Sequence, residues 1–305
     1  MTTATARADL SVIKARQQKT WASGDFAVVA ARIVLASELL ADAADLRAGW
    51  TVLDVACGNG NATLAAARSS THAVGIDYVP ELLEGGRTRA AAEGLDVEFR
   101  LGDAEDLPVE DASFDAVLSV FGTMFAPDHQ RAADEIIRVT RPGGTVGLAS
   151  WTPDGFIGQM FAVITRHVPA PPGVASPLLW GTEQHLSELF GAVAAGARSV
   201  HRTCTWRFAT PEQFVSFFRR WYGPTLKAFE ALDEHGRAAL AADLAQLARD
   251  WDRNHGGSIA VPATYLETIL TLRGYSSHPG GAGGPAAFPG RSATGAAGAD
   301  QGDQP

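Results

Sequence analysis

The chain has 305 residues, of which 46% are hydrophobic, and a formal net charge of −9 at pH 7. This length allows one sizeable apolar core, or one domain with an inserted lobe. The negative charge argues against a nucleic-acid substrate, because contact with a phosphate backbone requires clustered Lys and Arg, and no apolar run is long enough to predict a membrane span.

The N-terminal segment, residues 1–48, is predicted to form helices that precede the sheet. Its first ten residues lack the apolar stretch of a secretory signal, and two cysteines imply no disulfide framework. We therefore expect a cytoplasmic protein. Trp21 and Phe26 lie in this segment, where either a lid over a ligand or plain packing onto the domain would explain them.

A strand, a glycine-bearing loop and a helix follow from residue 51. The strand ends at Asp54, the loop carries Ala56, Gly58 and Gly60, and the helix covers residues 62–68. Glycine has no Cβ, so such a loop lets a ligand approach the backbone closely. A carboxylate at the strand end would repel a pyrophosphate and attract a cation. The loop therefore favours S-adenosylmethionine (SAM), which carries an ammonium and a sulfonium group and no phosphate.

Two nucleotide-binding patterns do not fit this loop. The dinucleotide fingerprint G-x-G-x-x-G/A, started at Gly58 and Gly60, places its third small residue at Thr63, which is neither Gly nor Ala. The phosphate-binding P-loop requires a Lys, and the sequence has none near this loop. Dinucleotide binding is therefore disfavoured.

Acidic residues recur where the next strands end. A strand over residues 72–76 ends at Asp77, about 20 residues after the first loop, which is the interval of one βα unit. An acid at this place can accept both hydroxyls of an adenosine ribose. The strand Val97–Leu101 leads to Asp103, which is placed to accept a hydrogen bond from an adenine amino group.

The sheet is predicted to continue with two further strands. Residues 113–119 form the fourth strand and residues 128–139 a helix, with Asp128 as its N-cap. A turn of Arg, Pro and two Gly residues at 141–144 then leads into a fifth strand at 145–150.

Four ordered segments resemble the class I SAM-dependent methyltransferases. They are LDVACGNG (53–60), GIDYVPELL (75–83), GDAEDLPVEDASFDAVLS (102–119) and RVTRPGG (138–144). The resemblance covers roughly residues 15–155. It is to the methyltransferase type 11 group, which includes the C-methyltransferases of ubiquinone and menaquinone biosynthesis. It implies an enzyme that uses SAM and releases S-adenosylhomocysteine.

The resemblance also implies which residues contact SAM. The methionine end would be lined by Asp54, Ala56, Gly58 and Gly60, the ribose held by Asp77 with Tyr78, the adenine by Asp103 with Ala104, and the methionine and substrate opening bordered by Ser119 and Phe121. In related enzymes an N-terminal helix folds over the cofactor, which adds Trp21. Ala56 stands where many members have the first Gly, and its methyl group is expected to fit if the local φ is negative.

Structural roles compete with some of these assignments. Asp103 and Asp106 also suit a turn or a cap, and Cys57 suits a small packing residue. For Asp54 and Asp77 the functional interpretation is favoured, because both end apolar strands, where an unpaired carboxylate is costly.

The pattern changes from residue 151 to about residue 273. A Pro-rich loop at 169–177 is followed by a helix at Glu183–Phe190, a strand at 198–208, helices at 211–229 and 233–254, and a final strand at Ile259–Leu272. The tail, 274–305, is mostly Gly, Ala, Pro and Ser. It is predicted to be disordered, because it cannot bury enough apolar surface to offset its ordering entropy.

Together the elements predict an α/β fold. It is a Rossmann-like, seven-stranded, mostly parallel sheet with helices on both faces, an antiparallel last strand and a helical insertion that covers the substrate. SAM is expected at the carboxyl ends of the strands. The expected division is a helical lid (1–48), a SAM-binding core (49–150), a substrate lobe with the final strands (151–273) and the tail.

The acceptor is predicted to be a small molecule, as in small-molecule or secondary metabolism, methylated at carbon, nitrogen or oxygen. The Asn/Asp-Pro-Pro-aromatic stretch of nucleobase amino-methyltransferases is absent, since residues 119–122 read Ser-Val-Phe-Gly. Aromatic residues are frequent in 151–225, and an apolar pocket suits transfer from a sulfonium, where positioning does most of the work. Two alternatives stay open: methylation of a peptide or protein in an open groove, and a non-catalytic SAM-binding regulatory or scaffold role.

The sequence does not identify a general base. A neutral amine needs none, whereas a phenol or an acidic carbon usually does. His129, His167, His185 and Tyr222 are candidates by residue type alone. No metal site is predicted, and the sequence leaves the oligomeric state open.

Overall fold

The computed structural model describes residues 10–254 and 256–274, which contain one seven-stranded sheet in the order β3-β2-β1-β4-β5-β7-β6. Its strands are β1 (Thr51–Val55), β2 (His72–Asp77), β3 (Val97–Leu101), β4 (Phe114–Val120), β5 (Thr140–Trp151), β6 (Ala194–Phe208) and β7 (Ile259–Leu272). β7 is antiparallel to both β5 and β6, and the remaining neighbours pair in parallel. The predicted Rossmann-like sheet with an antiparallel last strand is confirmed.

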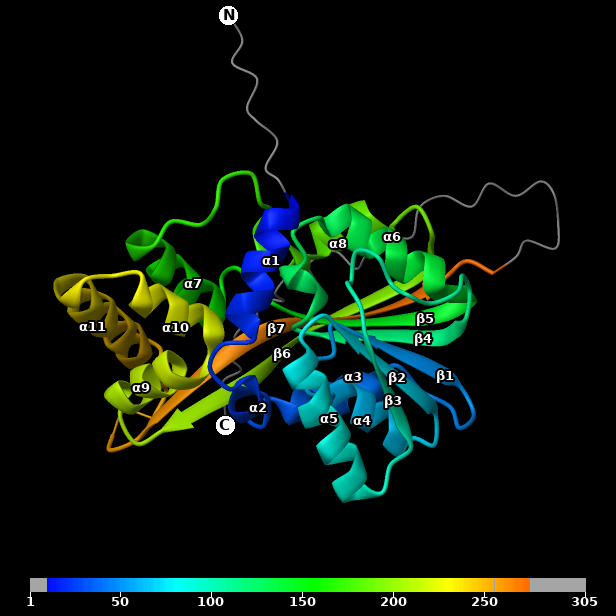
Figure 1. Ribbon diagram of the computed structural model, residues 1–305, viewed down its shortest axis with the longest axis horizontal. Coiled ribbons are helices and arrows are strands. Elements are labelled where there is room, and N and C mark those ends of the chain that lie inside the picture. Colours follow the sequence, from blue (N-terminus) through cyan, green and yellow to red (C-terminus); the bar gives the residue numbers. More distant parts are fainter. Residues whose placement is uncertain (1–9, 255, 275–305) are drawn as a thin grey trace, which may run out of the picture.

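Helices cover both faces of this sheet. In the described chain they are α1 (Leu10–Trp21), α2 (Phe26–Ala30), α3 (Val34–Ala43), α4 (Asn61–Arg68), α5 (Pro80–Glu93), α6 (His129–Val139), α7 (Phe156–His167), α8 (Glu183–Phe190), α9 (Pro211–Trp221), α10 (Gly223–Glu230) and α11 (Glu234–Asp250), with short 3-10 turns η1 (Thr123–Phe125) and η2 (Pro177–Gly181). α3, α4 and α5 lie along one face, and α6 and α8 along the other (Figure 1).

Local sequence explains where several of these helices begin. α6 buries Ala132, Ile136 and Val139 against the sheet, an i, i+4, i+7 spacing that places them on one face. The carboxylate of Asp128 accepts a hydrogen bond from the backbone N–H of Arg131 at 3.0 Å, so its predicted role as an N-cap is confirmed.

Two sequence predictions are wrong in detail. The turn expected at 141–144 is an irregular stretch inside β5, because Thr140 pairs with Phe114 and Thr145 with Ala116, so that the β5 backbone bulges between the two pairs. The helix expected at 211–229 is broken at Tyr222, which is extended, because Pro224 cannot continue a preceding helix.

Two helices, α5 and α7, were not predicted, and one prediction lies outside the described residues. α7 begins after Gly155, which makes no side-chain cap hydrogen bond, so no local start signal marked it. The predicted disordered tail falls on residues 275–305, which the structure does not describe, apart from its first residue, Gly274.

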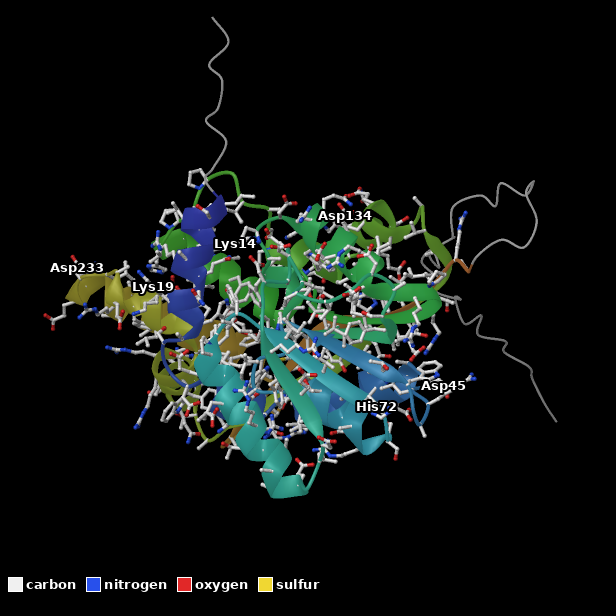
Figure 2. All side chains as sticks on the ribbon, turned by 45° about the vertical axis from the view of Figure 1, so that its right-hand side comes forward. Lys14, Lys19, Asp45, His72, Asp134 and Asp233 are labelled. Atoms are coloured by element: carbon white, nitrogen blue, oxygen red, sulfur yellow. The ribbon has the colours of Figure 1, made fainter. Side chains whose placement is uncertain are left out.

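The site is placed by the ends of the sheet. α1 and α2 stand over the carboxyl ends of the central strands, between the sheet and the group formed by α7, α9 and α10 (Figure 1). Lys14 of α1 lies toward these ends, whereas Asp45 and His72 lie at the opposite end, where β1 and β2 begin (Figure 2).

Candidate active site

A cavity opens at the carboxyl ends of β1, β2 and β4, and we call it the main cavity. The space of about 910 Å³ that it surrounds includes its open mouth. Nine of the predicted SAM contacts line it: Trp21, Asp54, Ala56, Gly58, Asp77, Tyr78, Asp103, Ala104 and Phe121.

Two predicted contacts, Gly60 and Ser119, lie outside this lining. Gly60 has a φ of +82°, and a Cβ there would come within 2.7 Å of the Phe99 ring, so this glycine serves the turn and its packing. The Ser119 hydroxyl donates to the backbone carbonyl of Val55 at 2.8 Å and accepts from the N–H of Thr123 at 3.0 Å. Ser119 therefore links the end of β1 to the start of η1 and does not face the main cavity.

Asp54 lies at the end of β1 and is almost fully buried. Its Oδ2 accepts hydrogen bonds from both the backbone N–H and the hydroxyl of Thr63, each at 2.8 Å, which fixes the turn into α4. Burial raises the pKa of Asp54 to about 7, although the two bonds from Thr63 lower it. A cationic ligand in the main cavity would favour the ionised form.

Asp77 joins the end of β2 to the glycine loop. Its two carboxylate oxygens accept hydrogen bonds from the backbone N–H groups of Gly58, at 2.8 Å, and Val79, at 2.9 Å. Burial raises the pKa of this carboxyl to about 6. Cys57, between the two acids, is buried in an apolar cluster with Leu64 and Phe99 and also lines the main cavity, so its predicted packing role holds in part.

Ala56 adopts a backbone conformation that the sequence did not lead us to expect. Its φ is +53°, so the condition of a negative φ is wrong. Phe121, on the facing wall, has a φ of +54°. Such left-handed conformations cost roughly 1–2 kcal/mol for residues other than glycine, and they concentrate at functional sites, where the surrounding structure holds them. The backbones of Ala56 and Gly122 approach each other closely. Only glycine fits at position 122, because a Cβ there would lie 2.3 Å from the Ala56 carbonyl oxygen.

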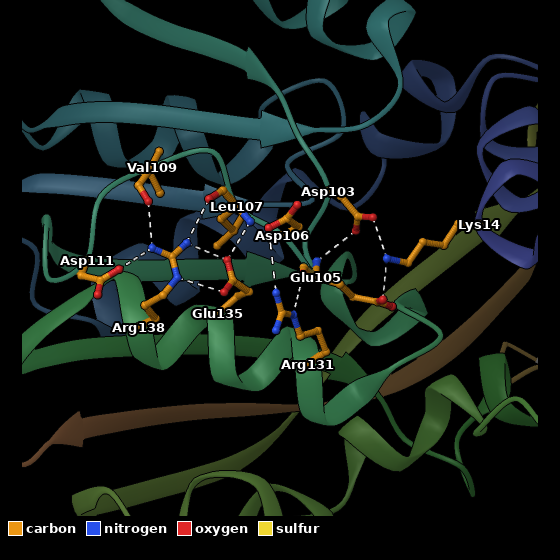
Figure 3. A network of polar contacts seen from close by, with 10 residues as sticks. All are labelled: Lys14, Asp103, Glu105, Asp106, Leu107, Val109, Asp111, Arg131, Glu135 and Arg138. Atoms are coloured by element: carbon orange, nitrogen blue, oxygen red, sulfur yellow. Dashed lines mark hydrogen bonds and ion pairs between the residues drawn. The ribbon is translucent and has the colours of Figure 1, made fainter. Parts of the chain in front are cut away.

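The loop after β3 is anchored to α6 and α1 by a polar network (Figure 3). Arg138 donates to the backbone carbonyls of Leu107 and Val109, and Glu135 accepts from the N–H of Leu107 at 2.7 Å. On the cavity side, Lys14 forms ion pairs with Asp103 at 2.7 Å and with the buried Glu105 at 2.5 Å. The network holds Asp103 at the cavity wall.

Sequence reasoning missed the role of one face of α1. Its residues Lys14, Gln17, Gln18 and Trp21 reach three separate loops. Gln17 donates to the carbonyl of Phe125 at 3.2 Å, and Gln18 donates to that of Tyr78 at 2.5 Å. The spacing i, i+3, i+4, i+7 is the signal that could have identified this docking face.

A second, smaller cavity adjoins the main one, and we call it the aromatic cavity. Its space of about 360 Å³ includes its opening. Eight aromatic side chains line it, together with Val29, Ile33, Ile157 and Met160. The two cavities share five lining residues: Trp21, Phe26, Ile33, Phe121 and Phe125. Tyr222 lies in the wall of the aromatic cavity, where the break between α9 and α10 places it against Trp21.

The three candidate histidines line neither cavity. His129 Nδ1 is 2.9 Å from His185 Nε2, beneath Trp180, and burial together with this neighbour lowers the pKa of His129 to about 4. His167, the last residue of α7, pairs with Asp243 of α11 at 2.9 Å. Packing and ion pairing explain these side chains, and the structure does not bring them to the site.

The described residues show neither a metal-ligating cluster nor a membrane-spanning helix. They contain no group of three or more His, Cys, Asp or Glu side chains arranged to hold a metal ion. None of their helices combines the length and the apolar character that a membrane crossing requires.

Comparison with known proteins matches the motifs and the fold. Residues 52–144 match the family described as "Methyltransferase domain". The uncharacterised protein Rv1405c of Mycobacterium tuberculosis is 38% identical over 247 residues, 80% of this chain and 89% of that protein. A demethylmenaquinone methyltransferase of Clavibacter sepedonicus is 40% identical over 105 residues, 34% of this chain and 42% of that enzyme.

A solved structure shares the architecture. A putative methyltransferase from Bacillus halodurans superposes with a TM-score of 0.55 at 18% identity, covering 78% of this chain and 98% of that one. At this identity the likeness concerns the fold alone. The motif order, the matched domain and the sheet topology agree, and the chain belongs to the class I SAM-dependent methyltransferases.

Proposed function

We propose that this protein transfers the methyl group of SAM to a small-molecule acceptor by in-line displacement. The observation that carries the proposal is that three strand-end carboxylates, Asp54, Asp77 and Asp103, meet at one cavity that shares a wall with an aromatic one. SAM supplies an activated methyl group on a sulfonium.

In this proposal each carboxylate meets a different part of SAM. Asp54 faces the ammonium group, Asp77 with Tyr78 the ribose, and Asp103 with Ala104 the adenine. Trp21, Phe121 and Phe125, shared by the two cavities, surround the place of transfer, where aromatic faces attract a sulfonium. We also propose that the described part of the N-terminal segment, residues 10–48, acts as the lid, and that the described residues of 151–273 supply much of the acceptor wall.

The shape of the aromatic cavity supports a small acceptor over a peptide or protein. Its wall comes from α2, β5, α7, β6 and α9, which enclose it on several sides. A peptide would need an open groove. A measurement of turnover distinguishes the non-catalytic alternative. Slow hydrolysis of bound SAM, with no acceptor found in a broad metabolite screen, would favour a regulatory or scaffold role.

The first experiment is a calorimetric titration with SAM and with S-adenosylhomocysteine. Asp77→Asn should weaken SAM binding by about 1–3 kcal/mol, the range for hydrogen bonds to a charged group. Asp106→Asn is the matched control, because its side chain lies on the neighbouring loop and is 87% exposed. Absence of binding by the folded wild-type protein would refute the proposal, and equal affinity of the Asp77 variant would remove Asp77 from the ribose role.

A further inference from the structure

The wall of the aromatic cavity contains no group that is charged at neutral pH. Among the described residues that line it there is no carboxylate, imidazole, amine or guanidinium. The polar side-chain groups are three indoles and the phenol of Tyr222. An indole N–H only donates hydrogen bonds, and that of Trp206 is buried without a partner in the described chain.

Tyr222 does not supply the missing base. Burial raises the pKa of its phenol above the usual value of 10, so the group stays protonated at neutral pH. The candidate histidines lie outside both cavities. A phenol or an acidic carbon bound here would therefore have no protein group in the described wall to take its proton.

Charged acceptors do not fit this wall either. A carboxylate, or a protonated amine whose N–H groups need acceptors, is strongly unfavourable in an apolar cavity without a hydrogen-bonding partner. An uncharged molecule with flat apolar faces suits aromatic walls, and the small size of this cavity favours a compact one.

We infer that the acceptor is a compact, uncharged aromatic molecule that attacks through a nitrogen lone pair and loses no proton to the protein. The inference rests on the proposed methyl transfer. The nitrogen lone pair forms the new bond to the methyl carbon, and the carbon–sulfur bond breaks with its electrons passing to sulfur. The positive charge moves from sulfur to a ring or tertiary nitrogen, and no proton has to leave.

The shared aromatic residues suit both ends of this step. Trp21 lies 4.8 Å from Phe125 and 5.8 Å from Phe26 between ring centroids, and all three line both cavities. Aromatic faces attract cations, so the same side chains stabilise the sulfonium before transfer and the quaternary nitrogen after it.

The test compares isoquinoline with 2-naphthol, a phenol of nearly the same shape. The full-length protein is incubated with SAM and each probe across a range of pH, and the methylated products are measured by mass spectrometry. Isoquinoline should be N-methylated with a kcat/KM that is flat above its own pKa. At neutral pH 2-naphthol should react at least tenfold more slowly and gain rate with pH as its own hydroxyl ionises.

Each outcome has a defined meaning once SAM binding is measured in parallel. A protein that does not bind SAM refutes the proposed function. If the protein binds SAM but methylates 2-naphthol faster than isoquinoline at neutral pH, the inference is overturned and SAM use stays intact. The same holds if it binds SAM but neither binds nor methylates isoquinoline. Tyr222→Phe adds a check: the shape of the isoquinoline pH profile should persist, and the loss of a pH-dependent step would identify Tyr222 as a base.

Discussion

The main cavity and the aromatic cavity share a wall, but their functional side chains are held in different ways. The carboxylates of the main cavity lie at strand ends, and backbone or side-chain donors of adjacent loops fix them, as Thr63 fixes Asp54. The aromatic cavity is held by packing between distant segments, for example the stacked rings of Phe121 and Trp151 at 3.8 Å. The directed hydrogen bonds of the main cavity suit one ligand, whereas the packed rings of the aromatic cavity can be replaced by other side chains to fit a different ligand.

This contrast implies that substitutions in the main cavity should change SAM binding more than acceptor binding. The largest effect is expected from Asp54→Ala, which removes the charge facing the ammonium group and leaves the Thr63 donors unpaired. We expect about 3 kcal/mol weaker SAM binding, roughly 150-fold. Calorimetry with SAM measures this, and circular dichroism checks the fold. A SAM affinity within twofold of the wild type would contradict the role of Asp54.

The docking face of α1 should have the next largest effect. Lys14→Met removes the ion pairs with Asp103 and Glu105, and we expect SAM to dissociate about five to ten times faster, equivalent to about 1 kcal/mol. Lys19→Met is the control, because Lys19 lies on the same helix and is exposed. Stopped-flow fluorescence of Trp21 would follow dissociation. Tighter SAM binding by the Lys14 variant would instead mean that Lys14 competes with the adenine for Asp103.

The buried acids should make SAM binding and stability respond to pH in opposite directions. The raised pKa values of Asp54, about 7, and Asp77, about 6, mean that both carboxyls bind protons more tightly in the ligand-free folded protein than in the unfolded chain. Their contribution to stability is therefore lost as pH rises through about 6 and 7. SAM affinity should rise over the same interval, by up to about tenfold per pH unit for each proton released.

Calorimetry and thermal unfolding across this pH interval provide the measurement. Asp54→Asn should remove the step near pH 7 and keep the lower one. A SAM affinity that does not vary with pH would show that neither carboxyl changes its protonation on binding.

The smallest effect concerns the strained backbone of the glycine loop. Ala56→Gly relieves a positive φ, and we expect a gain in stability of up to about 1 kcal/mol, since the greater unfolded-state freedom of glycine offsets part of the relief. Ala67→Gly in α4 is the control and should lose about 1 kcal/mol. Denaturant unfolding measures both. A destabilised Ala56 variant would show that the methyl group packs favourably in this loop.

The sequence by itself determined the half of the molecule whose signals are local. The glycine loop, the acids at the ends of β1 and β2, and the bounds of β3 and β7 follow from strand periodicity and βα spacing, which depend on neighbouring residues alone. The Asp128 cap follows from the residues around it in the same way.

Tertiary structure decided everything that depends on contacts between distant segments. The pairing of Lys14 with Asp103 spans 89 positions, and the positive φ of Ala56 is held by the approach of Gly122. Residue type alone suggested His129 as a base, but packing against His185 and Trp180 holds it away from both cavities. The aromatic cavity likewise forms only where α2, α7 and α9 meet. The sequence did not predict it, because burial by residues far along the chain leaves no local sequence pattern.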